Sequence, residues 1–162
     1  MLKTNTGPLA MGLMIATTLA LAACSSVGGG GGSSPAALSA GLSARMDQPG
    51  ASLNKQEAIG LINAYRATRG VAPLVHDVGL DGTAQALVNQ YAQTGQAPSM
   101  PQGLAQMKLS AGYATFAETF SGWRNSAADA AALAAPATKA GVAVAFNPSS
   151  SYGIHWVLVL GN

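Results

Sequence analysis

Two carboxylates in the second half of the chain, Glu118 and Asp129, are the candidates for a catalytic carboxylate pair. A hydrolytic pair needs carboxyl oxygens within a few ångströms of each other and a raised pKa on one of them. Each also lies three positions after a residue of helix-capping type, Thr115 or Ser126, where a carboxylate stabilises the start of a helix. We therefore expect both to serve as helix caps, with a hydrolytic pair as the alternative.

The two histidines and the serines indicate less. His76 precedes Asp77 between two predicted helices, so we expect it to pack or to lie on the surface. His155 alternates with its neighbours in the last predicted strand, and we identify no partner carboxylate or nucleophile near it, so it is expected to be a strand-face residue. The chain has no Gly-x-Ser-x-Gly elbow, and its glycine run at 28–32 precedes any predicted fold.

The elements that must position these residues begin with two helices. Asn54, followed three residues later by Glu57, resembles a capping box and predicts a helix that ends at Gly70. Asp77 starts a second helix, which Gly95 ends.

Both helices show an apolar face at helical spacing. On the first helix we expect Arg66 and Arg69 to lie on the wetter side. The residues predicted to face the core from the two helices are Ala58, Ile59, Ile62, Tyr65, Leu80, Ala84, Leu87, Val88 and Tyr91.

The rest of the chain is predicted to be loop, two shorter helices and a closing hairpin. Residues 94–112 are interrupted by prolines and glycine, so they are predicted mostly as loop. Helices follow Thr115 and Ser126, and residues 139–146 and 152–160 are predicted strands joined by a polar turn. Helices first and an antiparallel hairpin last predict an α+β sandwich.

Composition excludes several classes of protein. A single cysteine rules out an intrachain disulfide framework and a cysteine-rich zinc module. The chain has eight basic and six acidic residues, so its net charge is only +2. This small excess of basic residues does not predict nucleic-acid binding. The 110 residues from Leu53 onward are enough for one compact domain and too few for two.

The N-terminus has the pattern of a secretory signal. Lys3 gives a positive start, and residues 9–23 are uncharged and rich in Leu, Ala and Met. That stretch is shorter than the roughly 20 apolar residues of a spanning helix and suits a signal peptide. We predict a signal peptide over residues 1–23, with a marginal membrane anchor as the alternative.

The end of this stretch, Leu21-Ala22-Ala23-Cys24-Ser25, resembles the lipobox of bacterial lipoproteins. The resemblance implies cleavage before Cys24 and diacylation of its thiol, often with acylation of the new amino group. Two or three acyl chains would anchor the protein durably, at about 0.8 kcal/mol for each buried CH₂. Ser25 in place of aspartate implies sorting to the outer membrane of a Gram-negative cell, facing the periplasm. The alternative is an inert cysteine that ends a conventional signal.

The segment after Cys24 is predicted to be a tether. Residues 24–52 are rich in Gly, Ser, Ala and Pro and include five consecutive glycines, a composition that does not bury enough surface to offset its ordering entropy. We therefore place the folded domain at residues 53–162.

A series of short motifs covers nearly all of this domain. They are Ile62-Asn63-Ala64-Tyr65-Arg66, Gly70-Val71-Ala72-Pro73-Leu74, Ala84-Gln85-Ala86, Ala111-Gly112-Tyr113, Phe120-Ser121-Gly122-Trp123-Arg124-Asn125-Ser126, Gly141-Val142-Ala143-Val144-Ala145 and His155-Trp156-Val157-Leu158-Val159. In this order they resemble the CAP superfamily of cysteine-rich secretory, antigen five and pathogenesis-related proteins, also called the SCP domain. The resemblance implies an α-β-α sandwich.

The resemblance also implies a cleft in which many family members place two histidines and two glutamates around a divalent metal. At the positions matched to these four residues the chain has Leu87, Met107, Glu118 and Asp129. Lys108 lies beside Met107. Because leucine and methionine cannot replace histidine and glutamate as ligands of zinc, we expect no metal site and no cofactor.

Three functions remain open. The first is a non-catalytic envelope lipoprotein whose degenerate CAP domain binds an envelope protein, a glycan or the cell wall. The second is a carrier of a small apolar ligand such as a fatty acid or sterol, since Leu87 and Met107 make the cleft more apolar. The third is a hydrolase with a rebuilt site at Glu118 and Asp129.

Overall fold

The computed structural model describes residues 39–162. The predicted signal peptide, Cys24 and the first part of the predicted tether lie outside the described residues. In chain order the elements are α1 (Ala40–Ser43), α2 (Lys55–Thr68), β1 (Val75–His76), α3 (Val78–Thr94), β2 (Gln106–Ala111), α4 (Phe116–Asn125), α5 (Ala127–Leu133), β3 (Lys139–Phe146) and β4 (Ile154–Gly161).

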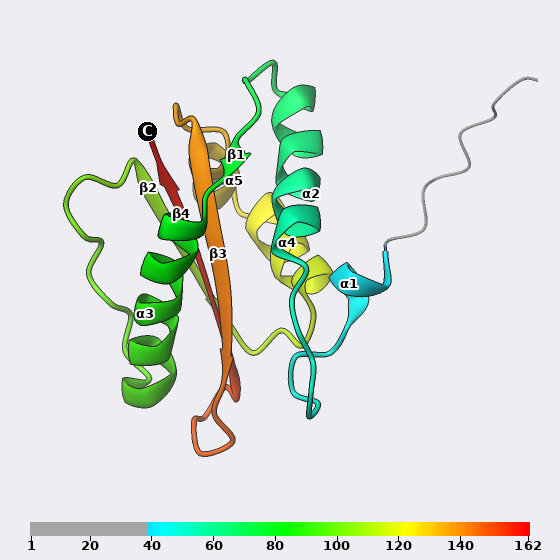
Figure 1. Ribbon diagram of the computed structural model, residues 1–162, viewed down its shortest axis with the longest axis vertical. Coiled ribbons are helices and arrows are strands. Elements are labelled where there is room, and N and C mark those ends of the chain that lie inside the picture. Colours follow the sequence, from blue (N-terminus) through cyan, green and yellow to red (C-terminus); the bar gives the residue numbers. More distant parts are fainter. Residues whose placement is uncertain (1–38) are drawn as a thin grey trace, which may run out of the picture. The chain divides into compact units, whose positions relative to one another are not determined.

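The strands form one sheet in the order β1-β3-β4-β2 (Figure 1). The short β1 runs parallel to β3, while β3 and β2 are both antiparallel to β4. Helix α3 covers one face of the sheet, and α2, α4 and α5 pack with the opposite face. The predicted sandwich of helices and a closing hairpin is confirmed.

Strand β4 forms the middle of the core. All eight of its residues are buried, and alternate side chains contribute to opposite faces, as the period of two requires. Trp156, Leu158 and Leu160 pack with α2, α4 and α5, whereas Val157 and Val159 pack with α3.

Helix α3 approaches β3 so closely that a side chain would not fit between them. A Cβ added to Gly141 would lie 2.2 Å from the carbonyl carbon of Leu80. Asp81, which is also buried, accepts a hydrogen bond from the backbone N–H of Val142 at 2.9 Å. The glycine of the Gly-Val-Ala-Val-Ala motif is therefore required by packing.

The helix starts follow the predicted caps. Asn54 accepts from the N–H of Glu57, Asp77 accepts from the N–H of Leu80, and α3 ends at Gly95 with φ at +67°. The first capping box is only half formed, because the Glu57 carboxylate accepts from the hydroxyl of Ser39 instead.

Residues 106–111 form a strand, although they were predicted as loop. The sequence Gln-Met-Lys-Leu-Ser-Ala alternates, and β2 pairs with β4 along its whole length. Pairing with a fully buried strand, rather than local propensity, makes this segment extended.

The predicted domain start at Leu53 is too late. Leu42 and Met46 are each 6% exposed and belong to the core cluster of α2 and α4. The N–H of Met46 also donates to the carbonyl of Ala114 at 2.9 Å. Part of the predicted 24–52 tether therefore belongs to the folded domain, because Leu42 and Met46 are buried in its core.

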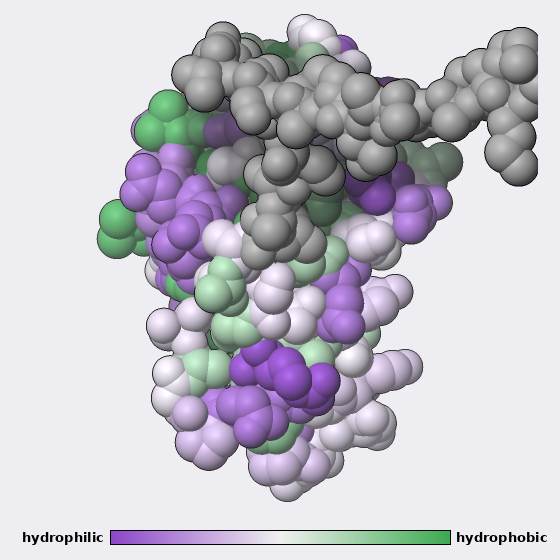
Figure 2. Space-filling view, turned by 90° about the vertical axis from the view of Figure 1, so that its right-hand side faces the viewer, coloured by the Kyte–Doolittle hydropathy of each residue, from purple (hydrophilic) through white to green (hydrophobic). Residues whose placement is uncertain are grey.

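The face that carries α2 has a mixed surface. Figure 2 shows hydrophilic and hydrophobic residues interspersed over the part of this face that is visible. Within residues 39–162, no helix has both the length and the apolar character needed to cross a membrane.

Candidate functional site

The four residues matched to the family cleft are divided between the two faces of the sheet. Leu87 on α3 and Met107 on β2 pack together in the cluster on the α3 face. Lys108, the next residue of β2, contacts Asp129 of α5, which belongs to the opposite face. The structure thus brings Leu87 and Met107 together, and it places Glu118 and Asp129 in the other helical layer.

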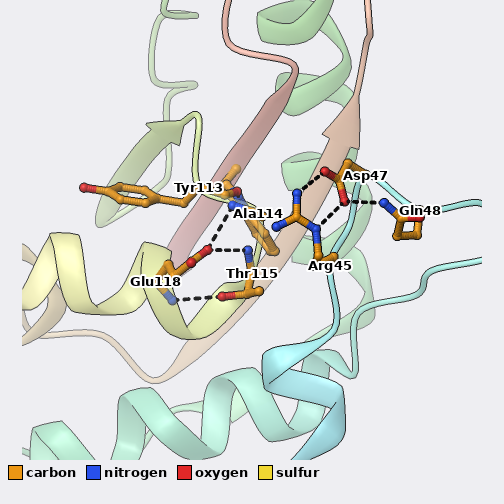
Figure 3. Close-up of polar contacts among 8 residues, drawn as sticks. Arg45, Asp47, Gln48, Tyr113, Ala114, Thr115 and Glu118 are labelled. Carbon is orange, nitrogen blue, oxygen red and sulfur yellow. Dashed lines mark hydrogen bonds and ion pairs between the residues drawn. The ribbon is translucent and has the colours of Figure 1, made fainter.

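Glu118 completes a capping box at the start of α4, as predicted. Its backbone N–H donates to Thr115 Oγ1 at 3.2 Å, and its carboxylate Oε2 accepts from the N–H groups of Thr115 and Ala114 at 3.0 and 3.1 Å (Figure 3). Two backbone donors at the helix start therefore occupy this carboxylate.

The N-terminal segment lies beside this cap. Figure 3 shows Arg45 paired with Asp47, whose carboxylate also accepts from Gln48. The bond to Arg45 holds the pKa of Asp47 below its usual value, and the same bond raises the pKa of Arg45. Arg45 thus pairs with its near neighbour in sequence rather than with Glu118.

Asp129 does not form the predicted capping box. The side chain of Ser126 makes no capping hydrogen bond, and the Asp129 carboxylate pairs with the ammonium group of Lys108 on β2. Glu118 and Asp129 consequently have different partners. A hydrolytic carboxylate pair requires the two groups to share one site, which these contacts do not provide.

A metal does not fit the residues at the family cleft positions. Leu87 has no donor atom, and thioethers such as that of Met107 are not among the ligands that zinc takes in proteins. Over residues 39–162, no three His, Cys, Asp or Glu side chains gather closely enough to hold an ion.

His76 belongs to a charged cluster at the start of α3. Its Nε2 lies 2.7 Å from Asp81 Oδ2, and Lys55 Nζ lies 3.5 Å from the same oxygen. Because Asp81 Oδ1 accepts the Val142 N–H, the cluster holds α3 against β3. His76, which was predicted to pack or to lie on the surface, is thus partly buried and paired with Asp81.

The polar residues of the first motif also hold the fold together. Asn63 exchanges two hydrogen bonds of 2.8 Å with the backbone of Leu74. Arg66 was predicted on the wetter side of α2, yet it is fully buried. Its guanidinium donates to four carbonyls, those of Ala72, Leu133, Ala135 and Ala137. Burial lowers the pKa of Arg66, and the carbonyls replace its lost hydration.

A groove lies between α2 and α4, which we call the α2–α4 groove. It consists of two adjoining cavities of about 360 and 210 Å³ that share Leu61, Phe120 and Arg124. The guanidinium carbon of Arg124 lies 5.9 Å from the centroid of the Phe120 ring, within cation–π range. The remaining lining residues are Ala64, Tyr65, Thr68, Ala117 and Ser121. The groove is therefore mostly apolar, with one cation at its edge.

A second, polar pocket of about 250 Å³ lies between the end of α3 and the β3–β4 turn, and we call it the hairpin pocket. One of its lining residues, Ser150, has its Oγ 3.2 Å from Nε2 of the buried His155. We did not predict this partner. The signal was a serine five residues before a histidine, across a turn that brings both to one end of a hairpin.

Comparisons with known proteins agree with this architecture. No curated protein matches the chain. Among solved structures, MpPR-1i is 19% identical with a TM-score of 0.53, and the match covers 64% of this chain and 87% of that one.

A second solved structure is an extracellular protein containing an SCP domain from Bacillus anthracis. It is 16% identical with a TM-score of 0.54, over 67% of this chain and 40% of that longer one. At these identities the likeness concerns the fold. The model of the cysteine-rich secretory protein family matches residues 59–160, and the chain therefore belongs to the CAP family.

Proposed function

We propose that this protein is an envelope lipoprotein whose CAP domain binds a small apolar ligand with an acidic head group in the α2–α4 groove. The observation that carries the proposal is the composition of the groove. Leu61, Phe120 and the methyl groups of alanines form its walls, and Arg124 lies at its edge. An arginine beside an apolar wall suits the carboxylate and alkyl chain of a fatty acid.

The envelope location rests on the N-terminal sequence. Cys24 in its lipobox-like context supports a lipid anchor, and Ser25 supports the outer membrane, facing the periplasm. The glycine-rich sequence after Cys24, which we predict from its composition to be a tether, would let the domain reach ligands away from the bilayer surface.

The second candidate function is binding of an envelope protein or of the cell wall through the same groove. The joint volume of the two cavities and their position between two helices also suit the apolar side chains of a protein segment. A hydrolytic role for Glu118 and Asp129 has less support, since these carboxylates are occupied by Thr115 and Lys108.

A thermal-unfolding titration of the chain from Ser25 onward, with palmitate and with cholesterol, tests the ligand. Binding to the native state adds about 2.7 kcal/mol at a hundredfold excess over the dissociation constant. We expect palmitate to stabilise the protein and Arg124→Gln to weaken this effect. Arg69→Gln, which removes an exposed charge outside the groove, is the matched control.

The result has three informative outcomes. Stabilisation by palmitate that Ala64→Trp abolishes supports the groove, because the indole would fill it. Stabilisation that Ala64→Trp leaves unchanged contradicts the groove as the site. If neither lipid stabilises the protein, the ligand proposal is contradicted and the envelope partner becomes the favoured candidate.

The anchor has a separate test. Cys24→Ala should release the protein from membranes or leave the precursor uncut, as fractionation and mass spectrometry would show. A variant that is processed normally and remains in the membrane fraction would contradict lipidation at this residue.

A further inference from the structure

His155 is the one titratable side chain on β4, and it lies among apolar residues on the α3 face of the sheet. It is fully buried, with the ring of Tyr91 from α3 at 4.6 Å between centroids and that of Tyr152 at 6.4 Å. In the described part of the chain, its Nδ1 is the one buried side-chain polar atom without a hydrogen-bond partner. Such an atom is costly for stability, so its presence calls for an explanation.

The other ring nitrogen of His155 is hydrogen-bonded to the hydroxyl of Ser150. His155 Nε2 and Ser150 Oγ are 3.2 Å apart, within reach for a nucleophile and its base. The backbone N–H of Tyr152 points at the same Oγ from 3.5 Å, so the hydroxyl accepts there and has its own proton free for His155. This arrangement favours Nε2 as the acceptor, which is the orientation of a general base.

Burial keeps this base neutral. It lowers the pKa of His155 below the usual value. The titratable groups that face the imidazole are the phenols of Tyr91 and Tyr152, and burial raises the pKa of Tyr91 further above neutrality. At pH 7 the Tyr91 phenol therefore stays uncharged beside the imidazole, which is free to accept a proton.

Ser150 lines the hairpin pocket, whereas the buried His155 is not among its lining residues. Ser149, Ser151 and Thr94 add further hydroxyls to the lining. The amide of Asn147 donates to the Ala92 carbonyl at 2.8 Å and so fixes the turn against the end of α3. A nucleophile held on a fixed turn at the rim of a pocket is accessible to a ligand.

We propose that Ser150 and His155 form a nucleophile–base pair that accepts an acyl group from small esters in the hairpin pocket. Ser150 Oγ bonds to the ester carbonyl carbon while its proton passes to His155 Nε2. The tetrahedral intermediate then collapses, the bond to the alcohol oxygen breaks, and His155 returns the proton to the leaving alcohol. Water repeats the sequence on the acyl-serine and releases the acid, so atoms balance and nothing is oxidised.

The pocket limits the class of ester. Its volume of about 250 Å³ is below the roughly 300–1,000 Å³ of pockets for drug-sized ligands, so it suits an acetyl-sized acyl group. The hydroxyl and amide lining suits an alcohol part that bears hydroxyls. This activity does not depend on the α2–α4 groove, which lies in the other helical layer.

The pair lacks the third group of a catalytic triad, because Nδ1 has no carboxylate partner. We therefore expect slow turnover of ordinary esters and use activated probes. Full-length protein would be treated with a fluorophosphonate probe, and the labelled peptide would be identified by mass spectrometry. Release of 4-nitrophenol from 4-nitrophenyl acetate gives an independent rate.

An exposed serine outside the pocket, Ser99, provides a matched control. We expect labelling at Ser150 that Ser150→Ala abolishes and that Ser99→Ala retains. His155→Gln should slow labelling about 100-fold, since general-base catalysis contributes at least that much. The absence of labelling at Ser150 in the native protein, or an unchanged rate in His155→Gln, would overturn the proposal.

A pH profile of the native protein covers the case in which His155→Gln does not fold. The labelling rate should stay constant as the pH falls to the ordinary histidine pKa of about 6.5 and decline only below it. A decline at higher pH, or none down to the pH of unfolding, contradicts His155 as the base.

Discussion

Polar side chains on the two faces of the sheet differ in how completely their hydrogen-bonding groups are paired. On the face of α2, α4 and α5, Arg66 donates to four carbonyls and Glu118 accepts from two backbone N–H groups. On the α3 face, His155 is buried with one ring nitrogen unpaired and the other on a serine at the edge of a pocket. On the first face these polar groups hold the fold, whereas on the second we propose that the pair of Ser150 and His155 is reactive.

The largest expected effect is the loss of the buried arginine. Arg66→Ala should lower the free energy of unfolding by about 3–5 kcal/mol, because it leaves four carbonyls without their donor and a cavity in their midst. Chemical denaturation measures this loss. Arg69→Ala, at an exposed position on the same helix, should change it by less than about 0.5 kcal/mol. Similar losses in both variants would contradict the role of Arg66.

The cap of α4 should contribute less. Thr115→Ala removes the side-chain acceptor at the helix start and should cost about 1 kcal/mol. Glu118→Gln should cost little, since an amide oxygen can still accept from the Thr115 N–H. Loss of ligand binding or activity in Glu118→Gln, with unfolding unchanged, would show that this carboxylate has a function beyond capping.

The ion pair between β2 and α5 should contribute less still. Lys108 and Asp129 retain 17% and 28% side-chain exposure, so solvent screens their attraction. A double-mutant cycle with Lys108→Met and Asp129→Asn should give a coupling energy of about 1 kcal/mol or less. A coupling of several kcal/mol would mean that the pair is effectively buried and that the α5 layer depends on it.

The smallest expected effect at neutral pH is that of His155→Leu, which replaces a buried imidazole that has one unpaired nitrogen with an apolar side chain. The pH dependence distinguishes the two proteins. Because the folded pKa of His155 is lowered, the unfolded chain binds more protons as the pH falls below the usual value of about 6.5, and stability declines until the pH passes the folded pKa.

The free energy of unfolding of the native protein and of His155→Leu should therefore be compared between pH 7.5 and 5. His155→Leu should lose the part of the acid-induced decline that the native protein shows in this range. An identical slope in the two proteins would mean that the folded protein protonates the imidazole as readily as the unfolded chain does, contrary to its burial.

Local signals in the sequence predicted most of the elements. The caps at Asn54, Asp77 and Thr115 and the stop at Gly95 depend on contacts within a few residues. Each forms as expected, except that the box at Asn54 lacks the return bond from Glu57. The same locality explains the failures. Strand β2 is extended because β4 pairs with it, and the local sequence of residues 106–111 does not identify the strand with which it pairs.

Candidate residues divided in the same way. Glu118 was predicted as a cap because its partner Thr115 is three residues away. Asp129 was assigned to a cap as well, but its carboxylate meets Lys108 on a strand 21 residues earlier. Leu87 and Met107 were matched to one cleft with both carboxylates, and the sheet lies between the two pairs.

The sequence by itself determined the helix boundaries, the closing hairpin and the family, because each of these depends on short-range spacing. Tertiary structure decided which charged groups are buried. Arg66 lies at a helix position that local periodicity assigns to solvent, and it is buried because the end of α5 and the residues after it, which include Leu133 and Ala135, fold over it. It also decided which side chains meet across a turn, as Ser150 and His155 do, since hydrogen-bond geometry is set only when the backbone closes.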